Sequence, residues 1–417
     1  MATPPANPSS SRSPTTAVAG SRAPLLAVLV LTFLGSVGTG VVTTGISFIA
    51  SQGLGYGKRM NLLLTLALGL SYIVGALLAG PIVRRFTRRH AWLGARGALA
   101  MVLVLITLGC QLPLLADRFA PGLTAFSFWV LVLIFSPATG VMWPIVEGYL
   151  SGGRSGGRLR RAIGRFNIVW SIALVASYWF MAPLLEEHPL LILSILGTLH
   201  LIMIGVLRWF PSDPANHTDA DHEHAPGSYR PLLRTFRILL IASYVVLSVL
   251  APLLPVVEEK LGIPVPWWTP IASSWLIARV VLFAVFERWH GWHGRWWTPW
   301  TGMTLLLTGF AGCMLAPSFP VLGMGMLITG LAVMGIGIAM TYCGALYYAL
   351  AVEAAEIDAG GKHEALIGLG YTLGPACGLI GLGLAPDDPE AFRLWVIVIT
   401  SLVVVGASVL AVRNARA

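Results

Sequence analysis

The chain has 417 residues, of which 56% are hydrophobic and only 11% are charged. A soluble domain carries about a quarter charged residues, and the mean hydropathy here is +0.78. This composition excludes an ordinary soluble protein and is typical of a chain that crosses a membrane many times. The formal net charge is +9, and the placement of the basic residues decides what that charge means.

A membrane-spanning helix needs roughly 20 apolar residues, because every backbone N–H and C=O must find its partner within the segment. The sequence contains twelve runs of this kind, so it predicts an all-α polytopic membrane protein. The predicted spans are Pro24–Ala50, Asn61–Val83, Ala91–Leu112, Gly122–Leu150, Phe166–Leu185, Leu190–Trp209, Leu232–Val257, Trp267–Phe286, Trp297–Leu315, Val321–Leu350, Ala365–Leu384 and Ala391–Val412.

Lysine and arginine are concentrated in the two terminal segments and in every second loop. Loops that face the cytoplasm carry an excess of these residues, so both termini are predicted to be cytoplasmic. Topology and contact with anionic lipid headgroups then explain the positive charge, and we expect no nucleic-acid partner. The loops on the other side hold few basic residues, namely Lys58, Arg59, Arg118, Lys260 and Arg393.

The longest polar stretch between predicted spans divides the twelve spans into six and six. The predicted organisation is a disordered cytoplasmic tail at 1–23, a six-helix half at 24–209, a cytoplasmic linker at 210–231, a second six-helix half at 232–412 and a tail at 413–417. A faint repeat at a nearly constant offset favours duplication. Gly109-Cys110 matches Gly312-Cys313, and Ile163-Gly164 matches Ile367-Gly368.

A short basic motif follows the second predicted span and reads GPIVRRFTRRH, from Gly80 to His90. It resembles the motif of the major facilitator superfamily, in which Gly and three apolar positions precede Asp-Arg and a basic cluster. Arg84 stands where the family usually has Asp, and Arg85 follows it. Glu287-Arg288 takes the corresponding place in the second half. No subfamily can be assigned.

With the six-plus-six pattern, this resemblance covers the chain from about Pro24 to Val412 and implies two halves that move around a central site. It further implies a monomer in a bacterial inner membrane that carries a small organic solute. A proton or another cation is the candidate coupling ion.

A glycine-rich stripe in the eleventh predicted span resembles the antiporter motif of the same family. The family places that motif in the fifth span, where this chain does not have it, so no drug/proton antiport is inferred. Small residues let helices approach closely, and proline kinks a span. Helix packing and a moving hinge both stay open for Gly370, Gly374, Pro375 and Gly378.

Arg279 stands out because a charge inside the membrane is costly and marks a functional site by default. It precedes Glu287 by two turns of helix, which places it about 12 Å deep in a core roughly 30 Å thick. It is predicted to pair with an anionic group of a substrate or with a carboxylate that titrates during transport. A structural pair or a side chain that reaches the interface is the alternative.

Glu147 is the one carboxylate within a predicted span of the first half. It is predicted to pair with Arg84, Arg85 or the arginines of the next loop as the inner end opens and closes, although a solvated helix end is equally compatible. His200 is either a proton carrier or hydrogen-bonded structure. The predicted inner gating set is Arg84, Arg85, Glu147, Glu287 and Arg288.

The family resemblance also implies a central cavity lined mainly by the first, fourth, seventh and tenth spans. Hydroxyl and aromatic side chains there suit a polar organic solute that forms hydrogen bonds and stacks, although each could equally serve packing. Carried over by position, the cavity residues are Thr43, Thr44, Trp143, Asn167, Trp170, Tyr244, Tyr347, Tyr348 and Tyr371.

The sequence gives little support for a metal site or for a catalytic site. The linker residues His217, Asp219, Asp221, His222, Glu223 and His224 have a composition that can bind zinc, but such loops are usually disordered, and no metal site is predicted. All four cysteines lie within spans without a CxxC pairing, so neither disulfides nor a zinc site are expected. We expect no cofactor and no enzymatic activity.

The sequence therefore predicts a transporter that moves a small organic solute by alternating access, with an organic anion or a sugar-like metabolite as the substrate class. Two alternatives stay open. One is a drug efflux transporter, which is disfavoured by the lack of Asp and Glu in the first span. The other is a membrane sensor or scaffold that has lost transport.

Overall fold

The computed structural model describes residues 22–154, 156–215, 226–352 and 357–416. Within these residues, twelve helical segments are long and apolar enough to cross a membrane. The first half consists of α1 (Leu25–Gly38) with the π-helical turn η1 (Thr39–Thr44), α2 (Ile46–Leu54), α3 (Lys58–Arg89), α4 (Gly94–Phe119), α5 (Thr124–Ser151), α6 (Gly156–Met181) and α7 (Pro189–Val206). The second half consists of α8 (Tyr229–Leu250), α9 (Leu254–Lys260), α10 (Trp268–Ala272), α11 (Ser274–Arg288), α12 (Trp297–Leu315), α13 (Gly323–Val352), α14 (Ile357–Leu384) and α15 (Pro389–Arg416). Short 3₁₀ turns precede or continue several of them, namely η2 (Pro121–Leu123), η3 (Leu207–Trp209), η4 (Ala251–Leu253), η5 (Val265–Trp267) and η6 (Ala316–Ser318).

All twelve predicted spans are present, but several helices continue past the charged residues at which the prediction ended them. The motif that was expected in a loop is helical, because α3 runs on to Arg89. Arginines in a last helical turn are favourable, since they face the negative end of the helix dipole. The eleventh candidate span begins at Gly360 and the seventh ends at Lys260. Glu364 and Glu258 therefore lie inside spans, contrary to the predicted boundaries.

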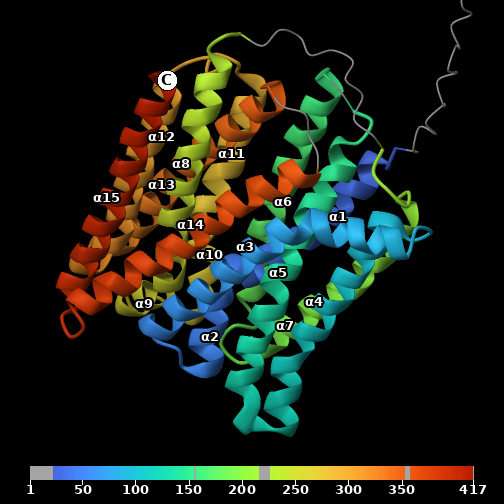
Figure 1. Cartoon of the computed structure of the whole chain (residues 1–417). Helices are drawn as coiled ribbons and strands as arrows, with labels where there is room; N and C mark the ends of the chain where they lie inside the picture. The colour runs from blue at the N-terminus through green and yellow to red at the C-terminus, as the bar shows by residue number, and fades with distance from the viewer. Residues whose placement is uncertain (1–21, 155, 216–225, 353–356, 417) are drawn as a thin grey trace, which may run out of the picture.

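The two halves meet along α3 and α14, which run side by side through the centre of the bundle (Figure 1). Glycine allows this close approach. A Cβ atom at Gly69 of α3 would lie 2.6 Å from the backbone carbonyl of Tyr371, and one at Gly378 of α14 would lie 2.5 Å from the Leu62 side chain. Lipid is as apolar as leucine, so helices associate in membranes mainly through such tight packing. A second contact between the halves joins α6 to α11.

Part of the glycine-rich stripe of α14 faces α8 within the second half. The Ser248 hydroxyl of α8 donates a hydrogen bond of 2.8 Å to the Gly370 carbonyl. A Cβ atom at Gly374 would lie 2.5 Å from the Val245 carbonyl oxygen. Pro375 interrupts the same helix. These contacts favour the packing interpretation of the stripe, and its role as a hinge stays a prediction.

Most arginines lie at one end of the bundle, which we call the basic end; Arg84, Arg154 and Arg288 mark it. Here the chain that leaves the first half is fixed to it. The Arg96 guanidinium donates to the Phe210 carbonyl at 2.9 Å, and Tyr149 Oη donates to the Ser212 carbonyl at 2.9 Å. Arg96 thus helps to hold this segment against the first half.

Candidate functional site

Arg279 lies on α11, where that helix meets α6, and its side chain is fully buried (0% exposed). Three aromatic rings surround the guanidinium. Its central carbon lies 4.4 Å from the ring centroid of Trp170, 4.6 Å from that of Tyr342 and 5.1 Å from that of Phe283. An arginine within about 6 Å of such rings is attracted by their π electrons. We call these four residues the Arg279 cage.

The cage combines residues of both halves. Trp170 comes from α6 in the first half, whereas Tyr342 and Phe283 come from α13 and α11 in the second half. The Trp170 and Tyr342 rings are nearly parallel, with an interplanar angle of 9° and centroids 6.3 Å apart. Any relative movement of the halves at this point therefore changes the surroundings of the guanidinium.

Among the described residues, Arg279 has no charged partner, and the nearby Tyr244 hydroxyl is neutral. Within the described residues, none of its three guanidinium nitrogens has a hydrogen-bond partner. Cation–π contacts offset only part of the cost, since a buried charge without a hydrogen-bonded counter-charge is destabilising by several kcal/mol. The cage thus offers a set of donors that a bound anion or another acceptor can satisfy.

A row of tyrosines leads from the cage to α3. Tyr244 of α8 lies within electrostatic reach of Arg279, and its ring packs edge-on against Tyr371 with centroids 5.3 Å apart. Tyr371 in turn packs edge-on against Tyr72 at 5.7 Å. The structure therefore brings together Arg279, Trp170, Tyr244 and Tyr371, which the sequence had nominated separately.

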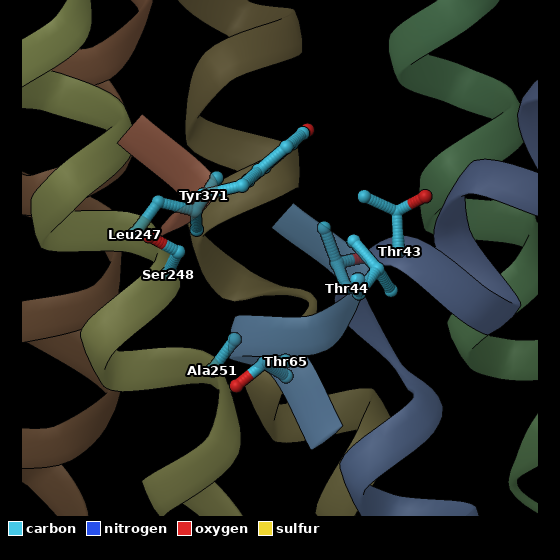
Figure 2. A pocket seen from close by; sticks show the side chains of 8 residues that line it. Thr43, Thr44, Thr65, Leu247, Ser248, Ala251 and Tyr371 are labelled. Carbon is cyan, nitrogen blue, oxygen red and sulfur yellow. The ribbon is translucent and has the colours of Figure 1, made fainter. Parts of the chain in front are cut away.

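A small cavity lies between the halves next to this row. Figure 2 shows Thr43, Thr44 and Thr65 of the first half opposite Leu247, Ser248 and Ala251 of the second, with Tyr371 at its border. The centre of a water molecule can move within about 10 Å³ of it, which is the lower limit for one ordered water. In the conformation described here this cavity is too small to hold an organic solute.

Two carboxyl groups of different halves meet at the far end of the tyrosine row. Tyr72 Oη donates a hydrogen bond of 2.5 Å to Glu364 Oε2 of α14. The Glu147 carboxyl group of α5 reaches α14 at Gly360, one turn from Glu364, and the two carboxyl groups act on each other's charge. Glu147 was predicted as a site residue and Glu364 was not, because the predicted eleventh span began at Ala365 whereas the span begins at Gly360.

Several predicted site residues lie elsewhere. Trp143 packs edge-on against Phe166 within the first half, at 6.2 Å. Asn167 is buried on α6. Tyr347 belongs to an aromatic cluster at the basic end, where its ring stacks on His293 with centroids 4.1 Å apart and its hydroxyl lies 3.2 Å from that of Tyr229. The predicted binding roles of these three residues stay predictions.

The residues predicted to form the inner gate are spread over the basic end. Arg84 and Arg85 are exposed on the last turns of α3, and Glu287 and Arg288 are exposed at the end of α11. Gly80 is buried in α3. Glu147, by contrast, lies deeper and next to a second carboxyl group. Gating by these residues stays a prediction.

His200 has a structural environment. It is fully buried on α7, its Nδ1 lies 2.9 Å from the Leu196 carbonyl oxygen, and its ring packs edge-on against Phe135. Among the described residues, no group of three His, Cys, Asp or Glu side chains could hold a metal ion. The linker residues considered for zinc, His217 to His224, lie outside the described residues. All four cysteines are free.

Comparison with known proteins identifies the architecture. No family model matches the sequence, and no curated protein matches it. Among solved structures, the nucleoside transporter NupG superposes with a TM-score of 0.64 at 14% sequence identity, over 94% of this chain and 98% of that one. A POT family transporter in complex with a thioalcohol-conjugated peptide gives a TM-score of 0.67 at 13% identity, over 94% and 96%.

A bacterial homologue of the human lysosomal transporter Spinster, in an inward-facing and occupied conformation, gives a TM-score of 0.59 at 15% identity, over 94% of this chain and 96% of that one. At sequence identities this low, the similarity shows a shared fold only. The chain therefore has the fold of the major facilitator superfamily, with the twelve membrane helices of its described residues in two six-helix halves, and it is an integral membrane protein.

Proposed function

We propose that this protein transports a small organic solute across the membrane by alternating access and binds that solute at the Arg279 cage. The observation that carries the proposal is the fully buried Arg279 guanidinium, which lies between the halves and has no charged partner among the described residues. A purely structural arginine in a membrane usually pairs with a carboxylate or with backbone carbonyls. Arg279 does neither within the described residues, so a bound solute would supply the missing acceptor.

The position of the cage supports a role in transport. A ligand held by Arg279 and stacked against Trp170 would touch both halves at once. Its binding free energy would then depend on how the halves are arranged, and only such a difference lets a ligand shift a conformational equilibrium. The structural neighbours are nucleoside, peptide and Spinster-type transporters, which is consistent with an organic solute.

The chemistry of the cage favours an organic anion. A guanidinium binds carboxylate or phosphate through two parallel hydrogen bonds, and the neighbouring rings suit a flat or apolar part of the same molecule. A neutral, sugar-like solute would use the same donors more weakly. A cationic drug would be repelled by Arg279, so the drug efflux alternative is disfavoured.

Topology completes the proposal. The basic end would face the cytoplasm, according to the positive-inside rule, with the segment from 210 to 231 as a cytoplasmic linker and the halves at 24–209 and 232–412. The protein would act as a monomer in a bacterial inner membrane and have no enzymatic activity.

The test combines ligand binding with flux. Purified protein in detergent is melted in the presence of carboxylates, amino acids, sugars and cationic drugs, because a ligand stabilises the native state by mass action. We expect anions to raise the melting temperature of the wild type but not of Arg279→Met. The matched control is Arg208→Met, which removes an exposed arginine that also lies over a ring, 4.0 Å from the Trp209 centroid.

The stabilising anion is then tested for uptake into proteoliposomes. Flux in the wild type and in Arg208→Met, with none in Arg279→Met, is the expected result. Equal stabilisation of Arg279→Met by every ligand would remove Arg279 from the site. Binding without flux in the wild type would favour the sensor alternative over a transporter.

A further inference from the structure

The Glu147–Glu364 pair joins the halves inside the membrane. Glu147 comes from α5 and Glu364 from α14, and their carboxyl groups lie close enough for each to act on the charge of the other. Glu364 is buried, with 8% of its surface exposed. The fit around Glu147 is tight as well, since a Cβ atom at Gly360 of α14 would lie 2.7 Å from Glu147 Oε2.

Elementary chemistry requires a proton in this contact. An ionised carboxylate is only an acceptor, so two carboxylates cannot form a hydrogen bond with each other. Two like charges at this distance also repel each other strongly away from water. Tyr72 Oη donates a hydrogen bond to Glu364 Oε2. This bond occupies one lone pair of Glu364 and does not remove the repulsion between Glu364 and Glu147. The pair must therefore hold one further proton, shared between Glu147 and Glu364.

Other charges do not supply the neutralisation. Within the described residues, the ion pairs do not include either carboxyl group. The titratable groups that act on the pair are tyrosines, which stay neutral at ordinary pH: Tyr72 of α3, Tyr244 of α8, Tyr342 of α13 and Tyr371 of α14. The helices around the pair also carry Arg84 of α3, Arg165 of α6, Arg237 of α8, Arg279 of α11, and Lys362 and His363 of α14. The charged residues of α4 and α15 lie toward the helix ends: Arg96, Asp117, Arg118, Glu390, Arg393, Arg413 and Arg416.

We propose that Glu147 and Glu364 form the proton-binding site that couples transport to a proton gradient, an inference that rests on the proposed function. With the proton bound, the pair holds α5 against α14 as described here. When the halves separate at this contact, each carboxyl group gains access to water and the shared proton leaves. Protonation thus stabilises this conformation, and proton release favours the opened one.

The pair is connected to the solute site by direct contacts. Glu364 is hydrogen-bonded to Tyr72, which packs against Tyr371, which packs against Tyr244 beside Arg279. On the other side, Tyr342 of the cage lies edge-on to His363, the neighbour of Glu364, with ring centroids 6.5 Å apart. A solute that shifts the cage rings would therefore disturb the helices that hold the proton.

The test uses the purified full-length protein without any solute. Infrared difference spectroscopy across a pH titration detects the carbonyl stretch of protonated carboxyl groups. We expect a carboxyl band at neutral pH that disappears in Glu147→Gln and equally in Glu364→Gln, because either amide can donate to the remaining carboxylate without a proton. Glu258→Gln is the matched control, since Glu258 is another buried carboxyl group, in a different place; whatever signal of its own it removes, the one lost in both Glu147→Gln and Glu364→Gln should remain.

The infrared band tests the proton site, and the solute flux tests the proposed transport, so the two can fail independently. Retention of the full band in both Gln variants would overturn the proton site, whatever the solute. Failure to find any solute would overturn the proposed transport but leave the band in place. Where a solute is found, a pH gradient should drive its uptake by the wild type and not by Glu147→Gln, whereas exchange of labelled for unlabelled solute should continue in the variant.

Discussion

Tyr72 of α3 and Glu364 of α14 are joined by a hydrogen bond of 2.5 Å across the contact between the two halves. Tyr72 therefore has two partners in the second half, because its ring also packs against Tyr371. This single side chain links the carboxyl pair to the row of tyrosines that ends at Arg279. Both side chains are buried, so little water is available to replace a lost partner.

Tyr72→Phe isolates the hydrogen bond, because it removes the hydroxyl and keeps the ring contact with Tyr371. Hydrogen bonds between membrane helices contribute about 0.6 kcal/mol on average and up to about 1.7. We expect a loss of about 1 kcal/mol, measured as a lower midpoint of denaturant unfolding in detergent. An unchanged midpoint would mean that the hydroxyl has other partners of equal strength.

Much of the fold could be predicted, because lipid imposes one rule on every span. A segment in the hydrocarbon core must satisfy its own backbone, so long apolar runs become helices. The errors are at the ends. The predicted seventh span ended at Val257 and the predicted eleventh began at Ala365, each next to a glutamate, whereas the helices continue through Glu258 and Glu364, whose side chains are buried in protein.

The candidate site was only partly predictable for a related reason. Arg279 was conspicuous because it interrupts an apolar run, and such a signal needs no knowledge of the tertiary structure. The Glu147–Glu364 contact joins residues far apart in the sequence, and only the packing of α5 on α14 brings them together. Two of the three aromatic partners of Arg279 were equally hidden, since Phe283 and Tyr342 look like ordinary apolar positions of a span, whereas Trp170 was nominated from the sequence.

The stripe of α14 offers a test of packing against flexibility. Gly374 is surrounded, since a Cβ atom there would lie 2.5 Å from the Val245 carbonyl oxygen and 2.8 Å from the Val249 nitrogen. Gly374→Ala should cost about 1 to 3 kcal/mol, as overpacking usually does. Gly383→Ala on the same helix is the control, because nothing lies within 4 Å of its Cβ position. Equal melting temperatures of the two variants would contradict the packing interpretation.

Arg154 closes the first half at the basic end. Its Nη1 donates to the carbonyls of Tyr149 and Leu150 at 2.9 and 2.7 Å, and its Nη2 donates to the Ala23 carbonyl at 2.7 Å. Burial, together with the nearby Arg22, lowers the pKa of the Arg154 guanidinium, but arginine stays charged in proteins.

Arg154→Ala should therefore release the start of α1 and cost about 2 to 3 kcal/mol, because hydrogen bonds to a charged group are among the stronger ones. Faster amide hydrogen exchange in the first turn of α1 is the expected observation. Arg158→Ala, at an exposed position nearby, should leave that exchange unchanged. Arg154→Lys should lie between the two, since lysine keeps the charge but loses the planar set of donors.

Asp388 gives a pH-dependent helix end. Its carboxylate accepts hydrogen bonds from the backbone N–H groups of Glu390 and Ala391 at the start of α15, and these bonds lower the pKa of the carboxyl group. The unfolded chain has the ordinary, higher pKa, so the stabilisation is complete above that value and is lost as the pH falls through the lowered one. Protection of the first α15 amides should decrease in this acidic range. Asp388→Asn should abolish the pH dependence, because asparagine caps a helix without titrating.

A substitution of Trp170, the cage residue contributed by the first half, tests whether the cage binds the solute. Cation–π contacts contribute about 0.5 to 2 kcal/mol, the larger value applying away from water, and removing the ring also removes a stacking surface for the solute. Trp170→Ala should weaken binding of the solute by about 5- to 30-fold, according to the usual relation between free energy and affinity. Trp170→Phe should retain part of the binding, because a smaller ring still faces Arg279. Titration calorimetry with the anion identified by melting measures both variants. Equal affinities of wild type and Trp170→Ala would place the solute away from α6, and the cage would then serve only to hold Arg279.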